Sequence, residues 1–534
     1  MKKHCVMTIA IVAGLILPCI VANFSPALAQ TGPEMGPFVM SAVVTKGDPR
    51  SDGGTFFDCD FCDVKIAGEH GLNDLGQVVI SGLRVGDCGF GVYVVSGRTG
   101  FRVADNCHAS PFGRFSLFVG GNINNKGQVA LNVGPEINSV IVDMILLYSD
   151  GRLNKVVAEG DESPIGTVFG GSCGFGLPSI NNNGAIAFFT CSNPDSQGRV
   201  FNGVLSYSGG AVQKAIKSGD SSPLGGLISL AFGNAEIVSI NDNGDILFGA
   251  GQLDPDITVP ERFGLFLATA EGIKKVELSK DTMPNGSKAA DNSIGLGSLN
   301  NKGDVVFGLL LSGNPKAGNF LYSGGQTSTI FLQGDPTPIG GTFDLLSDID
   351  DPTKKINDNG TVAIMANVTG GGSSQAIFMA SPRAVLKVVA IGDRLPTGEK
   401  IRGINSFAMN NLGQVAFFAN GSDSILNPNP LGVFLATPNP PQITSIKLKQ
   451  KKNAIQLRVN GTSMITNDTV IEINGVALDA IDYPRDFRED GGTITQVVSR
   501  DARLEQMLPS GQTVQVTVYN SLTNLRSAPV AFTR

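Results

Sequence analysis

Few residues in this 534-residue chain have the types and spacing that catalysis requires. Two histidines, His70 and His108, lie outside the N-terminal segment, and both fall in loops of the first repeat described below. A histidine general base therefore has two candidate positions, although a lone loop histidine more often caps a turn. Residues 170–174 match Gly-x-Ser-x-Gly, but a nucleophile elbow joins a strand to a helix, whereas here a glycine-rich loop precedes another strand. The sequence predicts no catalytic residue.

Two acidic clusters supply the carboxylate oxygens that Ca²⁺ prefers as ligands. One cluster surrounds a Cys-x-x-Cys stretch and the other precedes the sixth repeat, but neither has the glycine and distal glutamate of an EF-hand loop. Solvated loop carboxylates are the alternative interpretation. Ca²⁺ is thus the one cofactor that the sequence suggests, with candidate ligands Asp58, Asp60, Asp63, Asp348, Asp350 and Asp351.

Six cysteines follow the N-terminal segment, and an even number in an oxidising compartment predicts disulfides. Pairing neighbours in sequence keeps each bridge inside one repeat, while other connectivities remain open. Cys59 and Cys62 have the spacing of a redox motif, but no βαβ pattern surrounds them, so a structural bridge is favoured. The predicted pairs are Cys59 with Cys62, Cys88 with Cys107 and Cys173 with Cys191.

These histidines, acidic residues and cysteines lie in a chain that is organised by a recurring turn. The pattern Asn-x-x-Gly, followed by a small or apolar strand start, occurs seven times at spacings of 51, 57, 60, 59, 57 and 53 residues. This is the amount of chain that a four-stranded propeller blade needs. Glycine adopts a positive φ at little cost, and asparagine bonds back to nearby backbone donors, so each copy predicts a hairpin turn. The turn residues are Asn73, Asn124, Asn181, Asn241, Asn300, Asn357 and Asn410 with Gly76, Gly127, Gly184, Gly244, Gly303, Gly360 and Gly413.

Each repeat divides into four expected strands, which in the fourth copy are residues 235–240, 245–250, 264–270 and 273–279. An aspartate follows the fourth strand, and because it recurs once per repeat we interpret it as a turn cap rather than a ligand. Ligand residues are expected instead in the variable loops between strands two and three, 191–202, 251–262, 308–318 and 418–430, on the same rim. The aspartates are Asp48, Asp105, Asp161, Asp220, Asp281, Asp335 and Asp393, and the Asp105 copy is degenerate because Ala104 replaces the glycine that usually precedes the aspartate.

The two ends of the repeat region complement one another. Asp48, the first of these aspartates, precedes every strand of its own repeat, whereas the last repeat ends at 432–438 without a fourth strand. Residues near 38–46 are therefore expected to supply that strand and to close the ring, which removes open sheet edges. The fold class predicted is all-β: a seven-bladed β-propeller over 30–438 with an N-terminal strand closing the last blade, followed by a small β-sandwich over 441–534.

The repeat resembles that of exported bacterial proteins named for their NxxGxxAF motif, and the resemblance covers roughly residues 38–438. The copies at 181–188 and 410–417 fit the motif fully, while Val79, Ile80, Leu131 and Ile364 are apolar departures from it. After Pro440 and Pro441 the period stops, and the alternating pattern that follows looks like an IPT/TIG-type immunoglobulin-like module, with a glycine at 461 and the stretch 527–532 in the expected places. The resemblance implies secretion and a repeat β fold and carries no activity.

Residues 1–29 are predicted to be a signal peptide, because two lysines precede the apolar run 6–21 and small residues at 27–29 offer a cleavage site. No second stretch reaches the roughly 20 apolar residues that span a bilayer, so no transmembrane segment is expected in the mature chain. A net charge of −7 argues against nucleic acid as a partner. The chain contains no Trp and only six Tyr, which argues against a sugar-stacking site.

These observations together predict an exported non-catalytic binding or scaffolding protein that is secreted, periplasmic or held at the cell surface. It would act as a monomer that presents propeller rim loops to an unknown protein or surface ligand. The alternative is a carboxylate- or cation-dependent extracellular hydrolase or lyase, and a surface spacer without a small ligand is a third interpretation.

Overall fold

The computed structural model describes residues 36–534 except 59–63, 67–69, 84–88, 171–172, 231–237, 254–261, 296, 345–353, 423–428 and 452–453. The predicted signal peptide lies outside the described residues. Apart from the 3-10 turn η1 (Arg485–Phe487) and the one-turn helix α1 (Leu504–Met507), the described elements are β-strands. The all-β prediction is therefore confirmed. Among the described residues no helix is long and apolar enough to cross a membrane.

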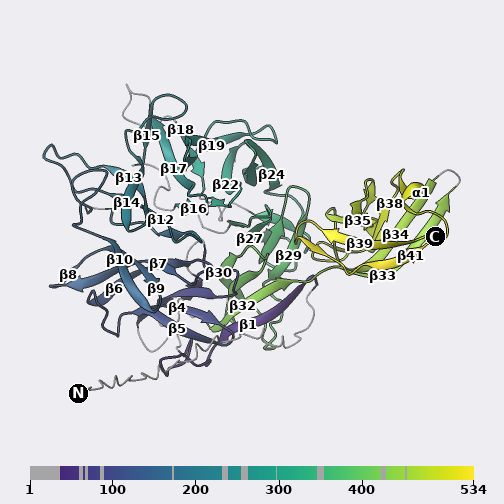
Figure 1. Ribbon diagram of the computed structural model, residues 1–534, viewed down its shortest axis with the longest axis horizontal. Coiled ribbons are helices and arrows are strands. Elements are labelled where there is room, and N and C mark those ends of the chain that lie inside the picture. The colour runs from purple at the N-terminus through teal and green to yellow at the C-terminus, as the bar shows by residue number, and fades with distance from the viewer. Residues whose placement is uncertain are drawn as a thin grey trace, which may run out of the picture. The chain divides into compact units, whose positions relative to one another are not determined.

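Between Phe38 and Pro438 the described strands form seven antiparallel sheets (Figure 1). The first three follow the chain with little interruption, and β8 is a short extension of the second. The first sheet comprises β2 (Val64–Ile66), β3 (Val78–Leu83), β4 (Phe90–Ser96) and β5 (Thr99–Asp105). The second comprises β6 (Arg114–Ile123), β7 (Val129–Ile137), β8 (Val140–Ile141), β9 (Met144–Ser149) and β10 (Arg152–Ala158). The third comprises β11 (Ser179–Ile180), β12 (Ile186–Cys191), β13 (Asn202–Ser208) and β14 (Ala211–Lys217).

In each of the next three sheets, two separate strands lie where the sequence predicts one first strand, and both pair with the same second strand. The fourth sheet comprises β15 (Leu227–Ser229), β16 (Ser239–Ile240), β17 (Ile246–Leu253), β18 (Arg262–Thr269) and β19 (Gly272–Leu278). The fifth comprises β20 (Lys288–Ile294), β21 (Ser298–Leu299), β22 (Val305–Ser312), β23 (Ala317–Ser323) and β24 (Gln326–Leu332). The sixth comprises β25 (Thr342–Asp344), β26 (Lys354–Ile356), β27 (Val362–Thr369), β28 (Gln375–Ala380) and β29 (Val385–Ala390).

The fourth sheet shows where the expected strands and the observed ones differ. β18 and β19 lie within two residues of the expected spans 264–270 and 273–279. The expected first strand, 235–240, is described only at Ser239–Ile240, where β16 pairs with the first two residues of β17. β15 pairs with the far end of β17 instead. Two separate segments thus occupy the place for which the sequence predicted one strand.

The seventh sheet is built from both ends of the repeat region. It comprises β30 (Gly403–Met409), β31 (Val415–Asn420), β32 (Pro430–Pro438) and β1 (Phe38–Thr45). β1 pairs antiparallel with β32 from Phe38 opposite Pro438 to Thr45 opposite Gly432, and Figure 1 shows the two strands side by side. The predicted closure of the last blade by an N-terminal strand is confirmed.

The seventh sheet also packs against the first. The ring of Phe57 contacts that of Phe418 edge-on at a centroid distance of 5.5 Å, within a cluster of buried residues drawn from both sheets. Backbone Ile66 N–H donates to Ser406 Oγ across the same junction at 2.8 Å. The first and last sheets are therefore neighbours, and the sheets form a closed ring.

Packing between adjacent sheets explains why the second strands are continuous apolar runs rather than alternating ones. All six residues of β12 and all six of β31 are buried. A strand that is covered on both faces favours apolar side chains on both, because its odd and even residues each face a neighbouring sheet, and only Thr190 and Asn420 of these two strands are polar. The sheets of a propeller bury both faces in this way.

The strands after Pro438 form two further antiparallel sheets that enclose a core of their own. One sheet comprises β33 (Gln442–Lys451), β34 (Ala454–Ile465), β38 (Thr493–Ser499) and β37 (Ile481–Asp482). The other comprises β36 (Val476–Ala477), β35 (Thr469–Ile473), β39 (Thr513–Asn520), β40 (Leu525–Arg526) and β41 (Val530–Thr533). Leu457, Val459, Val497, Val516 and Val518 are among the buried residues of this core.

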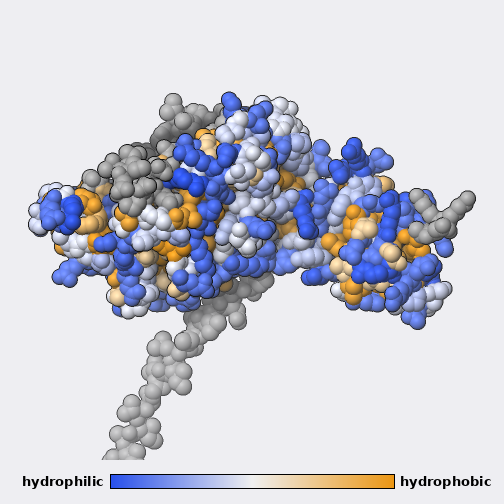
Figure 2. Space-filling view, turned by 90° about the horizontal axis from the view of Figure 1, so that it is seen from above, coloured by the Kyte–Doolittle hydropathy of each residue, from blue (hydrophilic) through white to orange (hydrophobic). Residues whose placement is uncertain are grey.

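Hydrophobic residues on the surface are scattered among hydrophilic ones on the face shown in Figure 2. The most exposed large apolar side chains include Leu75 and Leu412, in the turns of the first and last repeats, and Val140 and Ile141 in β8. These are small separate groups.

Candidate functional site

Each Asn-x-x-Gly turn is built by its asparagine. In the first copy Asn73 Oδ1 accepts hydrogen bonds from Leu75 N–H at 3.1 Å and from Gln77 N–H at 3.0 Å, and Gly76 has a φ of 75°. An L side chain rarely adopts that φ, which is why glycine recurs at this position. The asparagine at the start of each other copy likewise accepts from backbone N–H groups of its own turn.

The same asparagines also join neighbouring sheets. Asn73 Nδ2 donates to the carbonyl oxygen of Asn124 at 3.0 Å, and Asn410 Nδ2 donates to the carbonyl oxygen of Asn73 at 3.0 Å. The equivalent bonds run from Asn124 to Asn181, Asn181 to Asn241, Asn241 to Asn300 and Asn300 to Asn357. All seven asparagines are buried. One residue type therefore closes its own turn and holds the next blade.

A second ring follows one residue later in each turn. The backbone N–H of Asp74 donates to Asn125 Oδ1 at 2.8 Å, and the backbone N–H of Asn411 donates to Asp74 Oδ1 at 2.9 Å, which completes the circle. Asn182, Asp242, Asn301 and Asp358 occupy the intervening positions with equivalent bonds. No two aspartates are neighbours in this order. The arrangement supplies amide donors to every carboxylate and separates the like charges.

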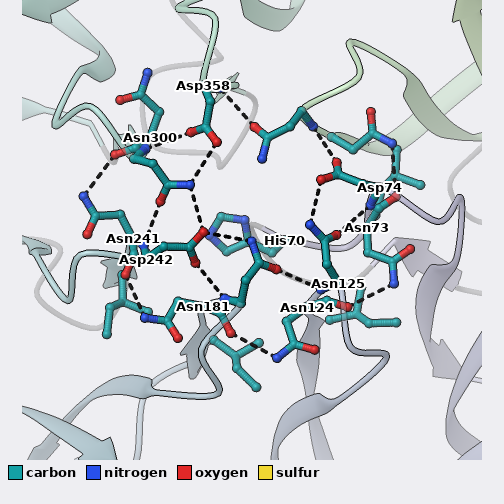
Figure 3. Close-up of a pocket in the computed structure, with 18 of the residues that line it drawn as sticks. His70, Asn73, Asp74, Asn124, Asn125, Asn181, Asn241, Asp242, Asn300 and Asp358 are labelled. Atoms are coloured by element: carbon teal, nitrogen blue, oxygen red, sulfur yellow. Dashed lines mark hydrogen bonds between the residues drawn. The ribbon is translucent and has the colours of Figure 1, made fainter.

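The two rings surround a small cavity of about 70 Å³. Figure 3 shows the side chain of His70 among the labelled asparagines and aspartates that line it. Such a volume admits a few water molecules, since each occupies roughly 30 Å³ in the liquid. The polar atoms of the turns are engaged with one another, and the part of the chain that the structure describes contains no group of three His, Cys, Asp or Glu side chains placed to hold a metal ion. We call the two rings of turn residues the axial cluster, and their bonds hold neighbouring sheets together.

A larger hollow lies between the first and second sheets, and we call it the interblade groove. Its volume is about 500 Å³. The end of β5 and the loop after it form one wall, and the hairpin of β9 and β10 forms the other. Its polar lining includes Arg102, Asp105, His108, Ser110, Arg152 and Asn154. Phe115, Tyr148 and Leu153 contribute apolar surface.

A histidine and an aspartate form a hydrogen-bonded pair in the interblade groove. His108 Nδ1 lies 2.8 Å from Asp105 Oδ2 and 2.9 Å from Asp105 Oδ1. The Asp105 side chain has no exposed surface, whereas that of His108 is 51% exposed. A buried carboxylate beside Nδ1 fixes the orientation of the imidazole and favours the tautomer with its proton on Nδ1. The pair thus presents an oriented histidine at the surface.

Two arginines give the interblade groove its charge. Arg102 Nη1 is buried and donates no hydrogen bond within the described residues, and its nearest carboxylate oxygens are those of Asp105 at 3.6 Å and Asp52 at 3.9 Å. Asp52 is itself engaged by Arg50 Nε at 2.8 Å. Arg152 is exposed and forms no ion pair with the residues that the structure describes.

The aspartates that follow the fourth strands have a different arrangement in most copies. Asp161 Oδ2, for example, accepts from Ala158 N–H at 2.9 Å, three residues earlier, and Lys155 Nζ lies 2.9 Å from its other oxygen. Asp48, Asp220, Asp335 and Asp393 accept the equivalent backbone bond. Asp105 instead accepts from the N–H groups of Cys107 and His108, which follow it. The degenerate copy has therefore turned its carboxylate toward the histidine.

The fourth copy departs in another way, through the buried acid Glu277. In the third and fifth copies Ile216 and Phe331 occupy the same place, four residues before the aspartate. Thr327 Oγ1 donates to Glu277 Oε2 at 2.9 Å. Burial raises the pKa of Glu277 to about 7, and the nearby carboxylate of Asp281 adds to the effect. Sequence reasoning missed this residue, although an acid among apolar equivalents was the signal.

Most of the predicted metal ligands are not described. Asp60, Asp63, Asp348, Asp350 and Asp351 lie outside the described residues, and Asp58 is exposed beside the first gap.

The predicted disulfide between Cys173 and Cys191 is present and lies within the third repeat. Cys107 is disulfide-bonded, whereas Cys59, Cys62 and Cys88 lie outside the described residues. Residues 171–172 of the Gly-x-Ser-x-Gly string are also outside them.

The chain is similar to several solved structures at low sequence identity and low TM-score. The β-propeller domain of the Trilobed protease from Pyrococcus furiosus matches at 10% identity with a TM-score of 0.37, covering 66% of this chain and 91% of that one. The polysaccharide lyase Uly1 matches at 10% identity with a TM-score of 0.35, and the match covers 76% of this chain and 99% of that one. XC5397, a gluconolactonase from Xanthomonas campestris, matches at 8% identity with a TM-score of 0.27, and the match covers 59% of this chain and 82% of that one. Likeness at this level implies no activity for this chain.

No curated protein sequence matches the chain. A model of a protein family does match residues 98–437, which span the second to sixth sheets, the outer strand of the first and the seventh sheet apart from β1. The chain therefore belongs to DUF7453, a family of unknown function.

Proposed function

We propose that the chain is an exported, non-catalytic binding protein whose ligand occupies the interblade groove of a seven-bladed propeller. The observation that carries the proposal is a groove of about 500 Å³ whose lining includes His108 and Arg152, which have no counterparts in the other repeats. Small-molecule sites usually measure roughly 300–1,000 Å³ and hold a few polar groups among apolar ones. Repeated residues serve the scaffold, so a non-repeating lining is the better candidate for recognition.

The axial cluster supports this assignment by contrast. An asparagine begins the turn in every blade, an asparagine or an aspartate follows it, and these residues bond to one another around the ring. A function that needed one ligand would not need the same bond seven times. The recurring turn residues are thus scaffold, and the interblade groove is the place that we assign to a ligand.

The same proposal covers the parts that flank the propeller. Residues 1–29 act as a signal peptide, residues 441–534 form an IPT/TIG-like module, and the repeat is that of the NxxGxxAF proteins. Expression of the full chain in a bacterial host tests export: we expect the exported protein to begin at Gln30 and to sediment as a monomer. An exported protein that still carries residues 1–29 would contradict the signal-peptide assignment.

A second function is favoured by one observation, the Asp105–His108 pair. A histidine oriented by a buried carboxylate is the usual form of a general base, so the alternative is an extracellular hydrolase or lyase. A base alone does not make a catalytic site. A site of that kind also needs a nucleophile or a group that stabilises developing charge.

One experiment separates the two functions. The full chain, with and without Ca²⁺, is incubated with a mixed panel of sugars, amino acids, organic acids and short peptides. Binding is followed through the ring signals of His108 by NMR, and conversion through the signals of the compounds. We expect a compound that shifts His108 and is recovered unchanged. Conversion that the His108→Gln variant lacks would show the alternative to be correct.

A further inference from the structure

We propose that the interblade groove binds a small cyclic carboxylate, with Arg152 and Arg102 facing the carboxylate and the apolar wall contacting the ring. This inference rests on the proposed function and names the class of ligand. It follows from three properties of the groove: the charge that it presents, the engagement of its one acid, and the apolar surface beside its cations.

The accessible charge of the groove is positive. Arg102 and Arg152 contribute two cations, and Asp105 contributes the one carboxylate of the lining. That carboxylate has no exposed surface and already accepts from Cys107 N–H at 3.1 Å and His108 N–H at 2.8 Å. A ligand therefore meets guanidinium donors rather than the acid. This local positive charge contrasts with the net charge of the whole chain, which is −7.

The amount of excess positive charge in the groove favours a ligand with a single negative charge. Two cations and one anion leave one positive charge when His108 is neutral. A carboxylate carries one negative charge, whereas a phosphate monoester carries about 1.5 to 2 at neutral pH. The planar guanidinium fork also matches the two oxygens of a carboxylate. A carboxylate satisfies both the charge and the geometry.

The rest of the lining fits a ring rather than an extended chain. Tyr148 stacks on Phe101 with a centroid distance of 5.8 Å and an interplanar angle of 30°, which holds its ring in place. Burial raises the pKa of the Tyr148 hydroxyl, so this group stays protonated and can donate a hydrogen bond. Leu153 adds apolar surface beside it. A rigid wall of this kind packs well against a flat or cyclic body.

Two sources can supply a cyclic carboxylate: an aromatic acid and a sugar acid. The test compares benzoate with benzamide and glucuronate with glucose, because each pair differs chiefly in the charged group. The full chain has three histidines, so the ring signals of His108 can be identified by their loss in the His108→Gln variant. Each compound is titrated into the wild-type chain and the change in those signals is fitted to an affinity.

We expect an acid to shift the His108 signals saturably and to bind at least tenfold more tightly than its neutral partner. Arg152→Gln should weaken that binding tenfold or more, because it removes an exposed cation without removing an ion pair within the described residues. Arg394→Gln, which removes an exposed arginine of the sixth repeat, is the matched control and should leave the affinity unchanged. Arg102→Gln should also weaken binding, although this variant removes a partly buried side chain.

Each outcome decides the matter. Binding of benzoate alone identifies an aromatic acid, binding of glucuronate alone a sugar acid, and binding of both a general carboxylate site. Equal affinity for an acid and its neutral partner, or an unchanged affinity in Arg152→Gln, would overturn the inference while leaving a groove that binds ligands. A His108 signal that no acid of either pair moves would also overturn it. If, in addition, no compound of the wider panel moves this signal, the proposed function fails as well.

Discussion

Asn410 Nδ2 donates to the carbonyl oxygen of Asn73 at 3.0 Å, across 337 positions of sequence. This bond helps to turn a row of similar hairpins into a ring, because it joins the last repeat to the first in the same way as the first five repeats each join the next. The β1–β32 pairing closes the ring a second time within the last sheet.

Replacing Asn410 with Ala should lower the free energy of unfolding by about 2–3 kcal/mol, because it leaves buried backbone partners unsatisfied. The side chain is 4% exposed, and its Oδ1 accepts from Leu412 N–H at 3.2 Å and from Gln414 N–H at 3.0 Å. Urea unfolding measures the change. Asn405→Ala removes an exposed asparagine of the same sheet and is the control. Equal unfolding midpoints for the two variants would show that the ring bond contributes nothing.

Replacing Gly432 with Ala should disrupt the pairing of β1 with β32. Gly432 has a φ of 138°, and a Cβ there would lie 2.3 Å from the carbonyl oxygen of Val44. Backbone atoms on both strands must then move, at a cost of about 2–3 kcal/mol. Hydrogen exchange across residues 38–45 should become faster than in the wild-type protein. Gly372→Ala, at a site with open space, is the control, and equal exchange in both variants would contradict the closure.

The buried acid Glu277 should make stability depend on pH. Its pKa is about 7 in the folded protein against an ordinary value of 4.5, so the folded state holds the proton more tightly than the unfolded state. The stabilisation is therefore complete below the ordinary value and is lost as the pH rises through about 7. Glu277→Gln should flatten the fall in Tm between about pH 5 and pH 8. Glu399→Gln, an exposed acid, should not, and a wild-type Tm that rises over this range because of Glu277 would refute the assignment.

Removing the disulfide of the third repeat should destabilise the propeller. Cys173 and Cys191 are 18 residues apart, and closing a loop of that length is worth about 3 kcal/mol. The double variant Cys173→Ala, Cys191→Ala should therefore unfold at a lower urea concentration than the wild-type chain. Thiol labelling of the denatured wild-type protein provides the check on the bond itself. Labelling of Cys173 or Cys191 without reduction would show that the bridge is not formed.

The candidate site was only partly visible in the sequence. His108 was noted as a lone histidine and Asp105 as a degenerate member of a repeated set, but nothing in their spacing showed that the carboxylate turns toward the imidazole. Arg102 and Arg152 come from neighbouring sheets, so their common place in the groove depends on how those sheets pack. The metal-ligand candidates remain a prediction, because most of them lie outside the described residues.

The sequence alone determined the local structure, because a turn needs only a few adjacent residues: an asparagine that can accept from its own backbone and a glycine that tolerates a positive φ. It also showed that the last repeat lacked a strand and that the N-terminus could provide one, as β1 does. Tertiary structure decided the rest. Which blade each asparagine amide reaches, where two sheets leave a groove and which glutamate becomes buried all depend on the packing of sheets about fifty or more residues apart, and no local pattern specifies that packing.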